Sequence, residues 1–294
     1  MTEHAGRHVL LTGGTGGIGF ASARALARLG FDVTVTGRDA SRGEAAVAQL
    51  REQSGNPHIS LLVGDLTTRR GVDAVADAWL GRGRALDVLV HNAGLMPGAV
   101  ERNEDGLETG FAVNVAAPLR LCHRLEPALA ARARVVTLTG GEHPSRLDLE
   151  NLQGERRFVA LSLYSHHKLV MMATMRALAH RWSALGRTVN VCYPGQASTA
   201  MTRAVTAADL PGPMRLLYPL FRWMTREDGG KSAEKASRST VHLVSSPDLE
   251  GVTGRYVDTR CRDRSWPKAI ADMSTCGAVW DVVAPLAGVE GFTA

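Results

Sequence analysis

Tyr164 and Lys168 stand four residues apart in a segment, residues 161–185, whose apolar spacing predicts a helix. Residues with this separation share one face of a helix, one turn from each other. A free tyrosine, with a pKa of about 10, is a poor base at neutral pH, but a nearby ammonium favours its phenolate form. The pair therefore predicts proton transfer, with Tyr164 as proton donor in one direction and base in the other.

A glycine-rich turn near the N-terminus predicts a second kind of chemistry. It follows an apolar run of strand character at residues 8–11 and passes directly into a segment with helical spacing at residues 20–29. Glycines allow the backbone to approach a diphosphate closely, and a helix N-terminus supplies unpaired N–H groups and a positive dipole end. The turn is therefore expected to bind a dinucleotide through Thr12, Gly13, Thr15, Gly16, Gly17, Ile18 and Gly19.

The end of the second expected strand bears on the choice between NAD and NADP. Folds that bind NAD usually place a carboxylate there, which accepts hydrogen bonds from the adenosine ribose. Gly37 holds that place and Arg38 follows it. A guanidinium suits a 2′-phosphate through charge-assisted, bidentate hydrogen bonds, although an ordinary surface arginine is the alternative. We expect NADPH/NADP+ as cofactor, with Arg38 as a contact and Arg42 as a candidate second one.

The scaffold that positions these residues is an alternation of strands and helices. Strands are expected at residues 8–11, 31–36, 59–63, 86–90, 134–138, 188–193 and 254–257, and helices at 20–29, 42–53, 72–80, 107–131, 161–185, 233–244 and 266–283. This order predicts an α/β fold, a Rossmann-type doubly wound parallel sheet, with sites at the C-terminal ends of the strands. One domain is expected over residues 1–294, with a C-terminal tail from about residue 258.

Six motifs in order resemble those of the short-chain dehydrogenase/reductase family. They are Thr12–Gly19 for T-G-x-x-x-G-x-G, Gly64-Asp65-Leu66 for an adenine-contacting acidic turn, His91–Gly94 for N-N-A-G, Phe111–Val115 for F-x-V-N, Tyr164–Lys168 for Y-x-x-x-K, and Pro194-Gly195 with Thr199 for P-G-x-x-x-T. The resemblance implies further cofactor contacts at Asp65, Leu66, Asn92, Ala93, Gly94, Pro194, Gly195 and Thr199. It also implies that Lys168 holds the nicotinamide ribose and that Asn114 holds a water linking Lys168 to solvent.

A narrower resemblance is to the retinol-dehydrogenase and oxidoreductase-domain branch of that family. It rests on Gly37-Arg38-Asp39 with Gly43-Glu44-Ala45, on Leu149–Leu152, and on the tail from Gly254 to Trp280. Members of this branch commonly act with NADP(H) on apolar ketones, aldehydes or alcohols, including retinoids. The resemblance therefore implies a small hydrophobic carbonyl or alcohol as substrate.

The chain departs from the family at the end of the fifth expected strand. The family has a serine pair there, and the second serine hydrogen-bonds the substrate carbonyl. The run Thr137–His143 reads T-L-T-G-G-E-H, which places Thr139 at the first serine and Gly140 at the second. Loss of one such donor typically raises a barrier by about 3 kcal/mol.

Three interpretations of this departure stay open. Thr139 supplies a hydroxyl from one residue away, although side chains at successive strand positions point to opposite faces. Another group reaches the site, for which the candidates are His143, Ser145 and Ser162. In the third, Tyr164 alone activates the carbonyl, or the chain performs no ordinary reduction.

The segment at residues 197–235 breaks the alternation and stands where the family carries its substrate lid. Its apolar side chains are expected to wall a pocket for a bulky hydrophobic ketone: Leu216, Leu217, Leu220, Phe221, Trp223 and Met224. Core or dimer packing is one alternative. The other is an interfacial membrane helix, because Arg215, Arg222 and Arg226 flank the apolar side chains.

Composition limits the remaining classes of function. The chain has 294 residues, 45% of them hydrophobic, a net charge of +5 and four dispersed cysteines without a C-x-x-C pair. We expect reduced thiols, a cytoplasmic location, no metal and no nucleic-acid partner, since Lys and Arg are scattered. His166 and His167 are expected to be packing or rim residues. Analogy with the family suggests a homo-oligomer, a dimer or tetramer.

The sequence therefore favours an NADP(H)-dependent reductase of a bulky hydrophobic ketone or aldehyde. Gly140 motivates a second hypothesis, in which the same fold serves a cyclase, dehydratase or epimerase with no net redox change. A third hypothesis is a cofactor-binding regulatory protein without turnover.

Overall fold

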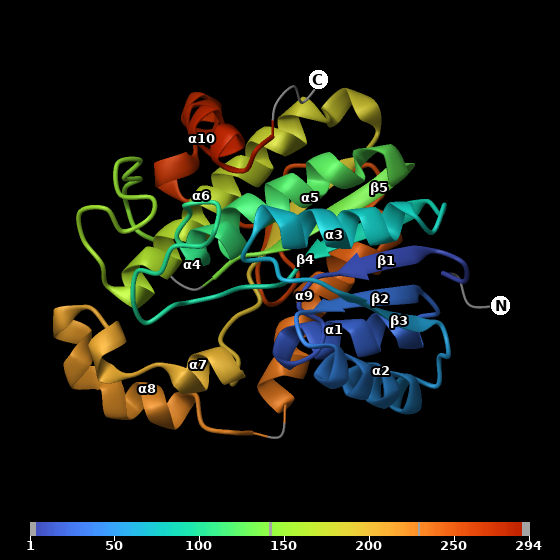
Figure 1. Ribbon diagram of the computed structural model, residues 1–294, viewed down its shortest axis with the longest axis horizontal. Helices are drawn as coiled ribbons and strands as arrows, with labels where there is room; N and C mark the ends of the chain where they lie inside the picture. Colours follow the sequence, from blue (N-terminus) through green and yellow to red (C-terminus); the bar gives the residue numbers. More distant parts are fainter. Residues whose placement is uncertain (1–3, 141–142, 229, 290–294) are drawn as a thin grey trace.

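A computed structural model describes residues 4–140, 143–228 and 230–289 of the chain. Seven strands form one sheet in the order β3-β2-β1-β4-β5-β6-β7, and each neighbouring pair is parallel (Figure 1). The strands are β1 His8–Leu11, β2 Asp32–Gly37, β3 Ile59–Val63, β4 Leu86–His91, β5 Leu129–Leu138, β6 Thr188–Cys192 and β7 Tyr256–Val257. The strand order reverses between β1 and β4, the switch point where such folds bind ligands. The predicted doubly wound α/β fold is confirmed.

Helices cover both faces of the sheet, and each face has its own apolar core. On one face pack α1 Gly17–Arg28, α2 Ala40–Ser54 and α9 Lys231–Ser245; on the other pack α3 Arg69–Leu80, α5 Ala117–Leu125 and α6 Ala160–Arg181. Helix α10, Met273–Leu286, packs on α6. Strand β4 serves both cores, because Leu89 faces the α6 side and Val88 and Val90 face the α1 side. Because both faces of β4 are buried, successive side chains must be apolar, as they are from Val88 to Val90.

The long helix expected at residues 107–131 is confirmed in outline but is wrong at its C-terminal end, where residues 129–131 belong to a strand. The chain forms α4 Thr109–Phe111, a π-helical turn Ala112–Ala116, α5, and a 3-10 turn Glu126–Ala128, and β5 begins at Leu129. Pro127 cannot continue an α-helix because it lacks the N–H group. The alanine-rich stretch that follows has high helix propensity, but it pairs with β4, where Leu129 stands beside Leu86. Tertiary pairing overrides local propensity here.

Residues 197–228 leave the sheet and form a separate layer at the lower left of Figure 1. This segment contains α7 Ala200–Ala204, 3-10 turns at Ala207–Asp209 and Gly212–Leu217, and α8 Tyr218–Met224. We call it the lid. Within the described part of the chain, no helix has the length and apolar character needed to cross a membrane.

Candidate active site

A cavity of about 560 Å3 opens at the C-terminal ends of the strands, beneath the lid. It brings together most of the residues that the sequence nominates, from both ends of the chain. The nominated residues that line it are Gly13, Thr15, Gly16, Gly17, Ile18, Gly19, Arg38, Asp65, Leu66, Asn92, Ala93, Gly94, Thr139, Tyr164, Lys168, Pro194, Gly195 and Thr199. Thr12 and Asn114 are outside the lining and act on it through hydrogen bonds.

At Gly13 and Gly19 the glycine turn is packed too closely against its surroundings for a side chain to fit. Gly13 has a φ of +68°, and a Cβ there would lie 3.0 Å from the Cα of Ala93. A Cβ at Gly19 would collide with the carbonyl oxygen of Gly13 and the side-chain amide of Asn92. Helix α1 starts at Gly17, so its free N–H groups face the cavity end of the turn. This geometry fits a diphosphate held by backbone groups.

Thr12 and Asn92 fix the turn in this place. The Thr12 hydroxyl accepts hydrogen bonds from the backbone N–H groups of Asn92 and Ala93, each at 3.1 Å. The side-chain amide of Asn92 donates to the carbonyl oxygens of Thr12, at 2.9 Å, and Gly13, at 3.0 Å. Thr12 therefore holds the glycine turn in position through hydrogen bonds and does not itself line the cavity.

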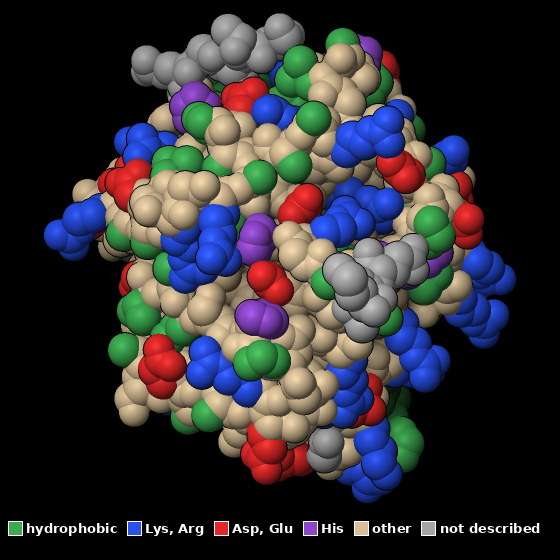
Figure 2. All heavy atoms as spheres, turned by 90° about the vertical axis from the view of Figure 1, so that its right-hand side faces the viewer, with side chains coloured by type: hydrophobic (Ala, Val, Ile, Leu, Met, Phe, Trp, Pro, Cys, Tyr) green, Lys and Arg blue, Asp and Glu red, His purple; other side chains and the backbone are tan. Residues whose placement is uncertain are grey.

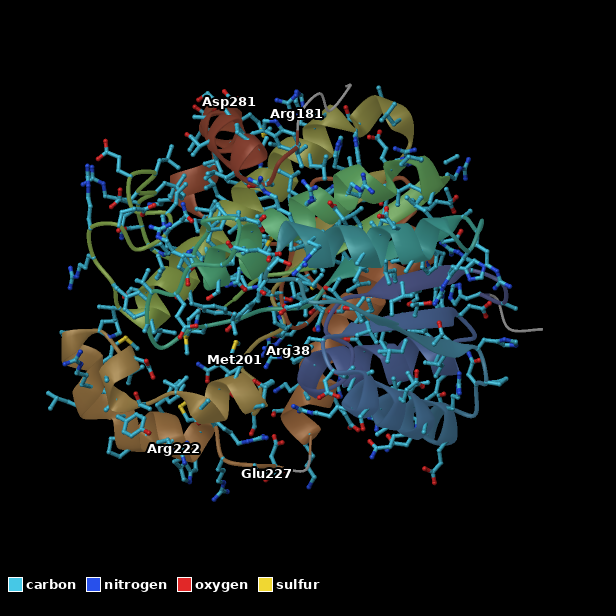
Figure 3. The ribbon with its side chains drawn as sticks, in the orientation of Figure 1. Arg38, Arg181, Met201, Arg222, Glu227 and Asp281 are labelled. Atoms are coloured by element: carbon cyan, nitrogen blue, oxygen red, sulfur yellow. The ribbon has the colours of Figure 1, made fainter. Side chains whose placement is uncertain are left out.

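Arg38 lines the cavity with an exposed guanidinium that has no hydrogen bond or salt bridge among the described residues (Figure 3). The next carboxylate, Asp39, caps α2 by accepting the N–H of Arg42 at 2.9 Å. A Cβ at Gly37 would lie 2.8 Å from Cγ2 of Thr15, so position 37 has no room for a carboxylate side chain. Arg42 is outside the cavity lining. The C-terminal end of β2 therefore presents the Arg38 guanidinium to the cavity and no free carboxylate.

Tyr164 and Lys168 lie together on α6 at the floor of the cavity. The ammonium of Lys168 is 5.7 Å from the centre of the Tyr164 ring and donates to the carbonyl oxygen of Leu138 at 3.2 Å. Burial raises the pKa of Tyr164 to about 12 and lowers the pKa of Lys168 to about 8. Burial thus outweighs the attraction between ammonium and phenolate that the sequence suggests, and Tyr164 keeps its proton at neutral pH.

Position 140 faces this pair. A Cβ at Gly140 would lie 3.0 Å from Cγ of Lys168 and 3.1 Å from Cε1 of Tyr164. Thr139 is buried, lines the cavity, and places its hydroxyl 3.4 Å from Nε2 of His143. Burial lowers the pKa of His143 to about 4, so its imidazole is neutral at pH 7. Thr139 is therefore the hydroxyl of the turn that reaches the cavity.

The other candidates for the missing donor do not line the cavity, namely His143, Ser145 and Ser162. Gly141 and Glu142, which belong to the same sequence run, lie outside the described residues. His143 contacts Thr139, which does line the cavity.

Asn114 sits in the π-helical turn and is buried. Its amide donates to the carbonyl oxygen of Leu95 at 2.6 Å, and its side-chain oxygen accepts the N–H of Leu95 at 3.0 Å. A Cβ at Gly94 would meet Oδ1 of Asn114 at 3.4 Å and Nζ of Lys168 at 3.6 Å. Asn114 and Lys168 therefore flank the same glycine, and Asn114 holds the loop after β4.

The two histidines between Tyr164 and Lys168 make hydrogen bonds away from the cavity. Nε2 of His166 accepts the N–H of Asp148 at 3.1 Å, and Nε2 of His167 donates to the carbonyl oxygen of Leu152 at 2.8 Å. Across residues 4–140, 143–228 and 230–289, no group of side chains has the arrangement of a metal site.

Fewer apolar side chains of the lid line the cavity than the sequence predicts. Phe221 and Met224 line the cavity, but the expectation that Leu216, Leu217, Leu220 and Trp223 wall it is wrong, because these side chains are exposed. Sequence spacing alone does not tell which face of a short helix turns inward. Other apolar walls were missed because they belong to no motif: Leu95, Met96, Leu161, Met201 and Val205. Val113 also lines the cavity and was missed although it stands in the F-x-V-N motif.

The family profile described as "short chain dehydrogenase" matches residues 7–210. The chain belongs to this family. Mouse retinol dehydrogenase 12 is 31% identical to this short-chain dehydrogenase over 289 residues, covering 97% of the chain and 87% of the relative. Mouse polyprenol dehydrogenase is 32% identical over 261 residues, covering 86% and 75%. The chain is thus an oxidoreductase-family member in the retinol-dehydrogenase branch.

The NADP complex of Pseudomonas aeruginosa RhlG has a similar fold, with a TM-score of 0.64 and 25% identity. The likeness covers 86% of this chain and 94% of that one.

Proposed function

We propose that this short-chain dehydrogenase uses NADP(H) to interconvert the carbonyl and alcohol forms of a bulky hydrophobic substrate. The observation that carries the proposal is the shared cavity, which is lined by Tyr164 and Lys168 and also by the unpaired Arg38. The names of two relatives, a retinol and a polyprenol dehydrogenase, favour an isoprenoid alcohol or aldehyde as substrate class. The apolar lining from Met201, Phe221 and Met224 agrees with such a chain.

The glycine turn and Arg38 would hold the dinucleotide, which supplies or takes up a hydride at the substrate carbon when bound. Tyr164 carries a proton at neutral pH because its pKa is about 12, and it donates that proton to the carbonyl oxygen during reduction. The charged form of Lys168 stabilises the phenolate that is left. The Thr139 hydroxyl donates a hydrogen bond to the substrate carbonyl, which Gly140 cannot do because it has no side chain.

The test is a panel of carbonyls offered with NADPH: retinal, a longer isoprenoid aldehyde, and bulky cyclic ketones. The expected result is loss of NADPH absorbance matched mole for mole by alcohol product, with NADH at least about tenfold less effective, since a charge-assisted bond contributes about 1.5–3 kcal/mol. Tight NADPH binding without turnover of any carbonyl or alcohol would contradict the proposal.

Gly140 supports one other candidate, a redox-neutral cyclase, dehydratase or epimerase that uses Tyr164 as acid and base. That candidate predicts product formed from substrate while NADPH absorbance stays constant. Mass spectrometry of the product together with absorbance separates the two.

A further inference from the structure

The outer side of the lid exposes an unusual concentration of apolar side chains. Five of the ten large apolar side chains exposed in the described part of the chain are here: Met214, Leu216, Leu217, Leu220 and Trp223. A sixth, Met224, is half exposed and also lines the cavity. Leu216 is 86% exposed and Trp223 61%. We call this group the outer lid face. Contiguous exposed apolar surface of this kind marks an interaction site.

The face is set apart from the rest of the surface. Helix α8 lies at the lower edge of the molecule, on the side of the lid away from the sheet (Figure 1). Leu216, Leu220 and Trp223 follow one another at spacings of four and three residues, which places them on one side of the turn and helix. The opposite end of the molecule mixes both charges, with apolar side chains scattered among them (Figure 2).

The same short helix also closes the cavity. Phe221 and Met224 of α8 line the cavity, while their neighbours Leu220 and Trp223 are exposed. The hydroxyl of Tyr218 ties the helix to the lid by donating to the carbonyl oxygen of Val205 at 3.2 Å. Helix α8 alone therefore separates the cavity from any surface that binds the outer lid face.

Positive charges predominate on this face, although acidic residues flank the segment that carries it. Asp209 and Asp228 accept hydrogen bonds within their own turns, and Glu227 lies beside this edge of the lid (Figure 3). Residues 212–226 contain Arg215, Arg222 and Arg226 and no Asp or Glu. Arg215 and Arg222 donate to lid carbonyl oxygens, those of Leu210 and Arg203, and none of the three arginines has a salt bridge among the described residues. Arg222 points outward from the lower edge of the lid (Figure 3). Arg226 lies 5.6 Å from the centre of the Trp223 ring.

These charges decide between two occupants. A second copy of the chain on this face would form a symmetric interface to which each copy brings the same three arginines. Glu227 would be the one flanking carboxylate without a hydrogen bond among the described residues. An anionic lipid surface instead supplies the opposite charge for the arginines and an apolar interior for the leucines. Tryptophan and arginine beside exposed leucines are typical of helices that lie in a membrane interface.

We propose that the outer lid face docks this protein on an anionic lipid surface, with α8 lying in the interface. A second consequence rests on the proposed function: an apolar substrate passes between the lipid and the cavity past Phe221 and Met224. Docking itself needs neither cofactor nor turnover, so it is tested separately.

The experiment is flotation of the full chain with vesicles of phosphatidylcholine alone or mixed with phosphatidylglycerol. We expect binding to the mixed vesicles that falls at high salt, and at least tenfold weaker binding to phosphatidylcholine alone. The variant Leu216→Glu with Trp223→Glu should lose at least tenfold in affinity for mixed vesicles. The matched control is Leu185→Glu, a leucine 40% exposed outside the lid, which should bind like the wild type.

Three outcomes would overturn the proposal. They are no binding to mixed vesicles at low salt, equal binding to both vesicle types, and binding unaffected by the double variant. Light scattering checks the rival occupant: a dimer of the wild type that the double variant dissociates would assign the face to a second copy. Turnover of a water-soluble carbonyl without vesicles tests the proposed function alone.

Discussion

The main chain of Gly140 faces the ring of Tyr164, and a Cβ at position 140 would lie 3.1 Å from Cε1 of that ring. Position 140 is thus directed at Tyr164, the proposed proton donor, but carries no side chain. Tyr164 and Lys168 match the family motif quoted above, whereas position 140 offers no hydroxyl beside them. The first two predictions ask what replaces that hydroxyl.

Gly140→Ser should raise kcat/KM for carbonyl reduction by about tenfold or more, since one added donor to a developing oxyanion is worth about 3 kcal/mol at best. The new Cβ requires a small shift of the flexible Lys168 chain, from which it would be 3.0 Å away. Gly140→Ala adds the same Cβ without a hydroxyl and should not gain. Equal rates for the two variants would show that a hydroxyl here does not assist the reaction.

Thr139→Val removes the hydroxyl that lines the cavity beside His143 and should lower kcat by about 10- to 100-fold. Thr139→Ser keeps the hydroxyl and should retain most of the activity. Steady-state kinetics on one accepted carbonyl measures both. Wild-type turnover in Thr139→Val would mean that Tyr164 activates the carbonyl alone.

Arg38→Leu should raise the KM for NADPH by about tenfold or more and leave the KM for NADH nearly unchanged, because only NADPH carries the 2′-phosphate. Arg42→Leu is the matched control, since Arg42 is an exposed arginine outside the cavity lining. A parallel rise in both constants for Arg38→Leu would argue against a phosphate contact.

Lys168→Met should abolish turnover and yet stabilise the fold at pH 7. Burial lowers the pKa of Lys168 from 10.5 to about 8, so below pH 8 the folded chain holds a costly buried charge. Between about pH 8 and 10.5 the folded wild type sheds this proton while the unfolded chain keeps it, so wild-type stability rises with pH. The variant's advantage, on the order of 2 kcal/mol at pH 7, should therefore shrink toward pH 10.

Urea unfolding of both proteins at a series of pH values measures this difference. An advantage that stays constant from pH 7 to 10 would show that Lys168 keeps its ordinary pKa in the folded chain.

The sequence was sufficient for the parts of the site whose chemistry is local. Gly13 and Gly19 reveal a turn that tolerates no side chain, and Tyr164 and Lys168 reveal a shared helix face, because spacing alone determines both. A parallel sheet with helices on both faces follows from the alternation of strands and helices. These predictions depend on neighbours along the chain.

Properties that depend on packing across the fold could not be predicted in this way. The start of β5 at Leu129 depends on pairing with β4 in place of local helix propensity. The raised pKa of Tyr164 depends on how much of α6 is buried. The exposure of Leu216 and Trp223 depends on which side of α8 meets the cavity, which an apolar run leaves open.

The most direct test of the account is the turnover of Tyr164→Phe on an accepted carbonyl, with NADPH binding followed by fluorescence. We expect at least a 100-fold fall in kcat, typical of a lost general acid at about 10²–10⁴-fold, with NADPH affinity within threefold of the wild type. Tyr256→Phe, a tyrosine on β7 outside the cavity, should keep wild-type kcat. Wild-type turnover in Tyr164→Phe would contradict the mechanism.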